Sequence, residues 1–187
     1  MRPFLFVPTQ PRPAMPITLS SASLPIFRTG LANLDHCLAK AQANAEARKF
    51  DPNVLVGVRL APDMLPFAAQ IRIACDAAKL AVARLSATEA PKFEDNESSF
   101  ADLRERIAKT LAYLNGVDPA TIDGREEVDI TFPVGRDKTR TMKGEAYLKH
   151  WAIPNFFFHV TTAYALLRHN GVDLGKVDYL AGAQANA

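Results

Sequence analysis

Residues 154–171, "PNFFFHVTTAYALLRHNG", place three consecutive phenylalanines before a histidine in one long apolar segment. Its proline suits the first turn of a helix, and its closing Asn-Gly pair is typical of a helix end. Because successive helical residues point in different directions, the three phenylalanines make this predicted helix apolar nearly all round. Such a helix is either central to a fold or covered by a partner subunit.

Three further segments have apolar residues at steps of three and four, which predicts three amphipathic helices before the last one. Ser99 and Asp102 form a capping-box pattern at the start of the third. Asp51 followed by proline predicts a short helical turn between the first and second. The predicted buried stripes are Phe27, Leu31, Leu34, Leu38, Ala41 and Ala45; Met64, Phe67, Ile71, Ala74, Ala78, Val82 and Leu85; and Phe100, Leu103, Ile107, Leu111 and Leu114.

Residues 118–144 differ in character, because β-branched and alternating residues surround Gly135. They predict a small β-hairpin or a long crossover between helices three and four. Residues 144–153 predict a short helix that breaks before Pro154. The pattern as a whole predicts an all-α four-helix bundle in one domain, residues 19–180, with a flexible extension over 1–18 and a flexible tail over 181–187.

The composition excludes several classes of function. The chain has 187 residues, with 22 Lys and Arg interleaved with 20 Asp and Glu, so no basic surface for nucleic acid or an anionic membrane is expected. Its longest apolar stretch, residues 151–167, is interrupted by polar residues and falls short of the ~20 that a membrane span needs. A soluble protein is therefore predicted. Cys37 and Cys75 have neither metal-site nor disulfide spacing, which favours a reducing compartment and predicts a cytoplasmic location.

His159 is the central candidate for chemistry, since it shares a stripe of the last helix with Asn155 and Thr162. One interpretation is a buried histidine hydrogen-bonded to a neighbour, and the other is a metal ligand. His169 lies ten residues further on, about 15 Å along a helix, so the two cannot share one metal ion. His150 precedes Pro154 and His36 is predicted on the surface, so neither is a natural co-ligand.

The second helix contributes Asp63 and Gln70, which its periodicity places on the edge of the apolar stripe, whereas Asp76 points the opposite way. Asp63 is interpreted first as an N-terminal helix residue, stabilised by free N–H groups, and second as a ligand or base. No nucleophile elbow, phosphate-binding glycine loop, HExxH motif or CxxC pair occurs, so neither covalent nor nucleotide chemistry is indicated.

Three motifs carry a family resemblance: "DPNVLV", "RLAPDMLP" with the following Gln70, and "HWAIPNFFFHVTTAYALLRHNGVDLGK". They resemble the family of domain of unknown function nineteen-ninety-three (DUF1993), among the DinB-like four-helix bundles, over residues 15–180. The resemblance implies an antiparallel bundle, frequent homodimers and, in many members of the superfamily, a divalent metal held by three histidines. One of these comes from the second helix, and a HxxxH pair comes from the last.

This chain departs from that pattern. Ala163 stands four residues after His159 and Asn155 four before it, and the second helix has no histidine, so at most one ligand position is filled. Any metal, such as Zn, Ni or Mn, would meet a weak, oxygen-rich site.

The preferred hypothesis is a homodimeric bundle whose polar cluster of His159, Asn155, Asp63 and Gln70, between helices two and four, binds a small ligand. One alternative is a divalent-metal-dependent hydrolase or thiol transferase of DinB-like type, with His159 as ligand and Asp63 as ligand or base. The other is a non-catalytic interaction protein that associates through its apolar last helix.

Overall fold

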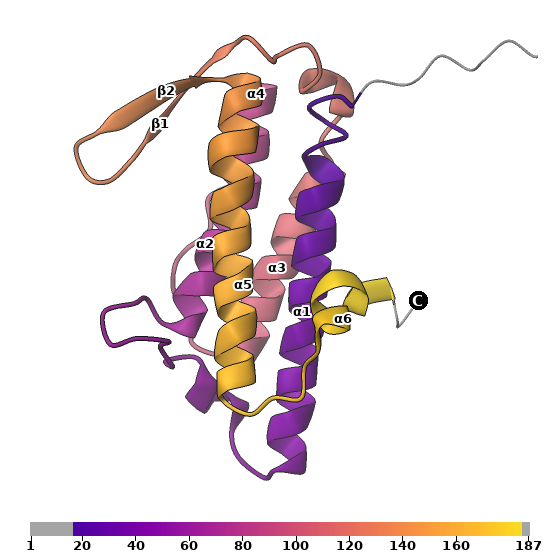
Figure 1. The fold of residues 1–187 in the computed structure, drawn as a ribbon, viewed down its shortest axis with the longest axis vertical. Helices are drawn as coiled ribbons and strands as arrows, with labels where there is room; N and C mark the ends of the chain where they lie inside the picture. The colour runs from indigo at the N-terminus through magenta and orange to yellow at the C-terminus, as the bar shows by residue number, and fades with distance from the viewer. Residues whose placement is uncertain (1–16, 185–187) are drawn as a thin grey trace, which may run out of the picture.

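The computed structural model describes residues 17–184. Four long helices form a bundle, with α5 packed most extensively against α2 and the hairpin projecting to one side of its upper end (Figure 1). The four-helix prediction is therefore confirmed. These helices are α1 (Leu24–Ala47), α2 (Phe67–Ser86), α3 (Phe100–Asn115) and α5 (Ile153–His169).

The bundle is not antiparallel throughout, because α2 and α3 run in the same direction. Phe67 and Phe100, the first residues of these two helices, stack with ring centroids 5.6 Å apart. The long crossover therefore lies between α2 and α3, where residues 87–99 return along the bundle; we call these residues the crossover strap. Helices α1 and α5 run in the opposite direction (Figure 1).

The predicted hairpin is confirmed: β1 (Asp129–Pro133) pairs antiparallel with β2 (Thr139–Lys143). Gly135 in the turn has φ +100°, a conformation that side chains other than glycine rarely adopt. The alternation of β1 buries Ile130 and Phe132 against the bundle and leaves Asp129, Thr131 and Pro133 exposed. The hairpin is thus attached to the bundle along one face.

The predicted break before Pro154 does not occur. α4 (Gly144–Tyr147) continues through a π-helical turn, η3 (Leu148–Ala152), directly into α5. Proline has no N–H and its ring displaces the carbonyl one turn earlier, so the chain widens locally to a π turn instead of ending the helix. This widened turn lies where α5 faces the upper part of α2.

The C-terminal segment folds onto α1, which the sequence did not indicate. α6 (Lys176–Ala181) continues into η4 (Gly182–Gln184), and Asn33 holds them by donating to the Tyr179 carbonyl at 3.0 Å and accepting from the Ala183 N–H at 3.0 Å. Residues 181–184 of the predicted flexible tail thus lie in α6 and η4, while 185–187, and residues 1–16 of the predicted extension over 1–18, lie outside the described residues. His36, predicted on the surface, is half-buried and lies 2.9 Å from Asp178 of α6.

The core follows the predicted stripes with two exceptions. Met64 precedes α2, which begins at Phe67 with Pro66 as its N-cap, and Leu111 is only partly buried. Phe156 packs edge-on against Phe27 at 5.1 Å, a contact possible because α1 has glycine at position 30. The predicted caps are present, at Asp51 of η1 (Pro52–Leu55) and in the Ser99–Asp102 box; the remaining short turn is η2 (Pro119–Thr121).

Candidate ligand site between α2 and α5

A buried histidine–glutamine pair joins α5 to the first turn of α2. The Nδ1 atom of His159 lies 2.7 Å from Oε1 of Gln70, and both side chains are buried, with His159 8% exposed. Because the two helices are antiparallel, the second turn of α5 meets the start of α2. The structure therefore brings together two of the four residues predicted for the site.

The hydrogen bonds around this pair determine which imidazole nitrogen carries the proton. Gln70 donates through Nε2 to the carbonyl of Leu65 at 3.0 Å, so its Oε1 is the acceptor. His159 therefore donates from Nδ1, and Nε2 keeps its lone pair. Burial lowers the pKa of His159 and favours this neutral form. The ring is held as an oriented acceptor, base or ligand.

The other two predicted residues lie elsewhere. Asn155 is half-buried one helical turn from His159 and lines a separate cavity between α5 and α2. Asp63 is exposed in the connection before α2, because the helix begins at Phe67, later than the periodicity indicated. No hydrogen bond in the described chain joins Asp63 to His159 or Gln70, so the four-residue cluster does not form as predicted.

The cavity beside Asn155 has a volume of about 220 Å³ and lies between α2, the π turn and the hairpin. Ile73, Leu80 and Ala152 provide apolar wall, and the indole of Trp151 adds an aromatic one. Its polar lining comes from Asn155, Asp76, Arg84 and Tyr147. A mainly apolar hollow with a few polar groups is the usual construction of a small-molecule site.

Arg84 makes few polar contacts with the other described residues. Its Nη1 donates to the Tyr147 hydroxyl at 2.9 Å, and its guanidinium lies 5.7 Å from the centroid of Phe132. No carboxylate among residues 17–184 forms an ion pair with it. Tyr147 is only 1% exposed, and burial raises the pKa of its phenol.

The donor set does not fit a three-ligand metal site. Within residues 17–184 no three His, Cys, Asp or Glu side chains lie close enough together to hold a metal ion. His150 and His169 are exposed, and His36 lies 2.9 Å from Asp178 of α6. His159 would therefore be the single histidine of any site on this seam.

The two cysteines are not reactive groups in this fold. Cys37 and Cys75 are free and buried in the core, and burial raises the pKa of each thiol to about 12. A thiol of that pKa carries almost no thiolate at neutral pH.

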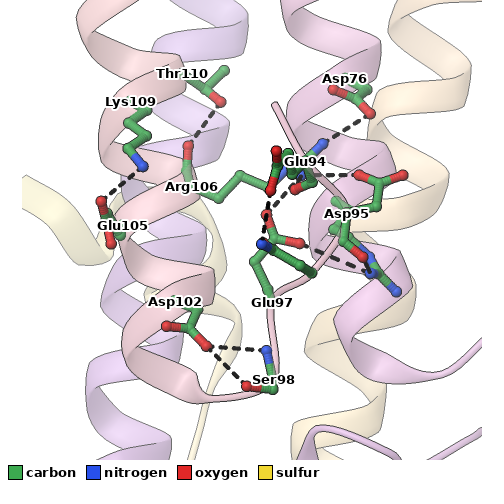
Figure 2. Close-up of polar contacts among 12 residues, drawn as sticks. Asp76, Glu94, Asp95, Glu97, Ser98, Asp102, Glu105, Arg106, Lys109 and Thr110 are labelled. Carbon is green, nitrogen blue, oxygen red and sulfur yellow. Dashed lines mark hydrogen bonds and ion pairs between the residues drawn. The ribbon is translucent and has the colours of Figure 1, made fainter. Parts of the chain in front are cut away.

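A second polar cluster, around Arg106 of α3, was not predicted. Arg106 is only 3% exposed, and its guanidinium binds Asp76 at 3.0 Å, Asp95 at 3.0 Å and Glu97 at 2.6 Å (Figure 2). Its Nη1 also donates to the carbonyl of Glu94 at 3.1 Å. Arg106 is buried in α3 beside Leu103 and Ile107, and its acceptors come from α2 and the crossover strap, so sequence spacing could not pair them.

This cluster holds the crossover strap against the bundle. Lys79 of α2 lies 2.9 Å from Asp76 and 4.2 Å from the ring centroid of Phe93 in the strap. A hollow of about 440 Å³ lies beside the strap and α3, but Arg106 and Glu97, two of its polar lining groups, are already bound to each other. The cluster is therefore structural, and the seam between α2 and α5 remains the candidate site.

Comparison with known proteins identifies the family of this chain. In the part of the chain that the structure describes, no helix has the length and apolarity that a membrane span requires. No curated protein matches the chain. A crystal structure of a DinB family member protein from Shewanella denitrificans is 42% identical, covers 87% of this chain and 92% of its own, and superposes with a TM-score of 0.81. The model of DUF1993, a domain of unknown function, matches residues 19–180, so the chain belongs to the DUF1993 family.

Proposed function

We propose that this protein binds a small organic molecule on the seam between α2 and α5. The observation that carries the proposal is the cavity of about 220 Å³ lined by Asn155, one helical turn from the His159–Gln70 pair. The cavity is walled largely by rigid helices, which suits a preformed site. A ligand there could hydrogen-bond to Asn155, whose half-buried amide makes no side-chain hydrogen bond within residues 17–184.

The test uses Trp151, the only tryptophan of the chain, as a reporter inside the cavity wall. Three probes of matched shape and no near-ultraviolet absorption are titrated: cyclohexanecarboxylate, cyclohexanemethanol and cyclohexylmethylamine. The proposal expects a saturable change in Trp151 fluorescence with at least one probe. Filling the cavity with Ala77→Leu removes that change, while Ala108→Leu on the exposed face of α3 keeps it. No saturation with any probe overturns the proposal.

A metal-dependent hydrolase or thiol transferase is the rival function. The neutral His159 with its Nε2 lone pair, oriented by Gln70, has the form of a metal-bound histidine and its outer-shell partner. The rest of the three-ligand set is absent from the described residues, so no metal-dependent step is assigned. Elemental analysis of protein purified without chelator, for wild type and His159→Ala, decides the matter: one equivalent of zinc, nickel or manganese lost in the variant would favour the rival.

We further propose that the protein is a cytoplasmic homodimer. The support is Phe158 of α5, a large apolar side chain that is 56% exposed on a largely apolar helix. An exposed aromatic residue of this kind favours cover by a second subunit. Sedimentation at micromolar concentration tests it, with Phe158→Asp expected to shift any dimer toward monomer and a strictly monomeric wild type excluding the proposal.

A further inference from the structure

We infer that the ligand of the α2–α5 cavity is a small organic carboxylate with an apolar body, its carboxylate bound by Arg84 and its body lying against Trp151. This inference rests on the proposed function and names the class of molecule. It is carried by cavity groups that keep unused hydrogen-bond donors among residues 17–184, together with the sign of the charge at the hairpin end of the cavity.

Arg84 supplies the strongest of these groups. A guanidinium has five N–H donors in a planar fork that matches the two oxygens of a carboxylate. Only one donor is used within the described residues, in the 2.9 Å hydrogen bond to Tyr147. Stacking near Phe132 and Tyr147, at 5.7 and 5.9 Å from the ring centroids, holds the fork in place at the cavity wall.

Tyr147 supplies a second donor at the same place. Its hydroxyl accepts from Arg84, and within residues 17–184 no acceptor takes its own hydrogen. The ring is fully buried against Phe132 at 4.9 Å, so the hydroxyl has little freedom to move away. Burial raises the pKa of Tyr147, so the phenol keeps its proton and remains a donor at neutral pH.

The charges around the cavity favour an anion at the Arg84 end. Arg140 of the hairpin lies 5.7 Å from the centroid of the Trp151 ring, and like Arg84 it has no carboxylate partner in the described chain. Asp76, the acidic residue of the lining, is bound by Arg106 at 3.0 Å and Lys79 at 2.9 Å. Its charge is balanced, so it does not offset the two arginines.

The remaining walls determine the body of the ligand. Ile73, Leu80 and Ala152 offer no hydrogen bonds, and the indole of Trp151 presents a flat apolar surface. An inorganic phosphate has no apolar body and would leave these walls without a partner. A monocarboxylate with a compact hydrocarbon or aromatic body matches both ends of the cavity.

The experiment compares the three matched probes by Trp151 fluorescence in wild type, Arg84→Met, Arg84→Lys and Tyr147→Phe. We expect cyclohexanecarboxylate to bind at least about tenfold more tightly than cyclohexanemethanol or cyclohexylmethylamine, because a charge-assisted bidentate contact is made only by the carboxylate. Arg84→Met should remove that preference, and Arg84→Lys should keep part of it. Tyr147→Phe should weaken carboxylate binding several-fold.

Arg48→Met is the matched control, since Arg48 also stacks on an aromatic ring, Phe50 at 5.2 Å, outside the cavity. It should leave all three affinities unchanged, and thermal unfolding of each variant verifies that it folds. Equal or tighter binding of the alcohol or the amine overturns the carboxylate inference and leaves the proposed function standing. A preference for carboxylate that survives Arg84→Met also overturns it, and saturation by none of the probes overturns both.

Discussion

Arg106 and Arg84 lie on helices of the same bundle, yet their surroundings differ in the number of acceptors. Arg106 is caged by the side chains of Asp76, Asp95 and Glu97 and by one carbonyl, and only its Nε lacks an acceptor (Figure 2). Among residues 17–184, Arg84 contacts one hydroxyl, that of Tyr147, and two aromatic rings. A buried cation with all its partners inside the protein stabilises the fold, whereas one with unused donors beside a cavity is available to a ligand.

The difference follows from what each neighbouring segment carries. The crossover strap has a run of acidic residues, Glu94, Asp95 and Glu97, and it crosses α3 where Arg106 lies. The hairpin and the α4 turn bring Phe132 and Tyr147 to Arg84 but no carboxylate. Two similar side chains thereby acquire different roles from the segments folded over them.

The largest expected effect is on Arg106. Arg106→Met removes a buried cation and leaves the buried carboxylate of Glu97 without it, so the free energy of unfolding should fall by about 3–5 kcal/mol, measured by urea denaturation. Arg104→Met is the control, because Arg104 pairs with Asp35 at 2.7 Å near the surface and should cost about 1 kcal/mol or less. Equal losses for the two variants would contradict the structural role of the cluster.

The next effect concerns the lower end of the seam. Gln70→Leu leaves the buried Nδ1–H of His159 without its acceptor, so stability should fall by about 1–3 kcal/mol. Combining it with His159→Phe removes the stranded donor, so the double variant should be more stable than the sum of the two single losses predicts. Additive losses in this double-mutant cycle would show that the pair is not coupled.

A smaller effect is expected for Arg84. Arg84→Met loses one hydrogen bond and a weak cation–π contact, so the free energy of unfolding should fall by about 1–2 kcal/mol, less than for Arg106→Met. Urea denaturation under the same conditions provides the comparison. A loss as large as that of Arg106→Met would mean that Arg84 is structural, and the contrast between the two arginines would disappear.

The smallest effect is the pH dependence that His159 contributes. Burial alone lowers the pKa of His159 below its ordinary value of 6.5, so as the pH falls below 6.5 the unfolded chain takes up a proton that the folded chain does not. Stability should therefore decrease with falling pH between 6.5 and the lowered pKa. Proton NMR titration, with the signal assigned by its loss in His159→Phe, measures the midpoint.

Gln70→Glu is the matched variant for this titration. A carboxylate beside Nδ1 should raise the pKa of His159 relative to wild type, because an opposite charge favours the protonated ring. A wild-type midpoint at or above 6.5, or no upward shift in the variant, would show that the imidazole is not buried against residue 70.

Local patterns predicted the helices well, and they failed where a distant segment intervened. The stripe of α1 from Phe27 to Ala45 is buried as expected, since α-helical periodicity reports directly which side of a helix is apolar. The break before Pro154 was wrong, because packing of α5 against α2 keeps the helix continuous through a π turn. α6 was missed because it is short and is held by Asn33, far away in the sequence.

The site was predicted in part for the same reason. His159 and Gln70 lie on helix edges that the periodicity located, and their contact at 2.7 Å follows once the two helices are neighbours. Asp63 was misplaced because the predicted apolar stripe of the second helix began at Met64, three residues before Phe67, where α2 begins. Arg84 was not singled out, since nothing in its local sequence shows what lies above it.

Local sequence patterns were sufficient to identify the four helices, the capping box of α3, the hairpin and the family, because these depend on residues that are close along the chain or on a long shared pattern. Three features appear only in the folded chain: α2 and α3 are parallel, the crossover strap supplies acceptors to Arg106, and Arg84 keeps unused donors beside a cavity. Hydrogen-bond partners and cavities depend on distances across the fold, and those exist only when segments far apart in the sequence have packed together.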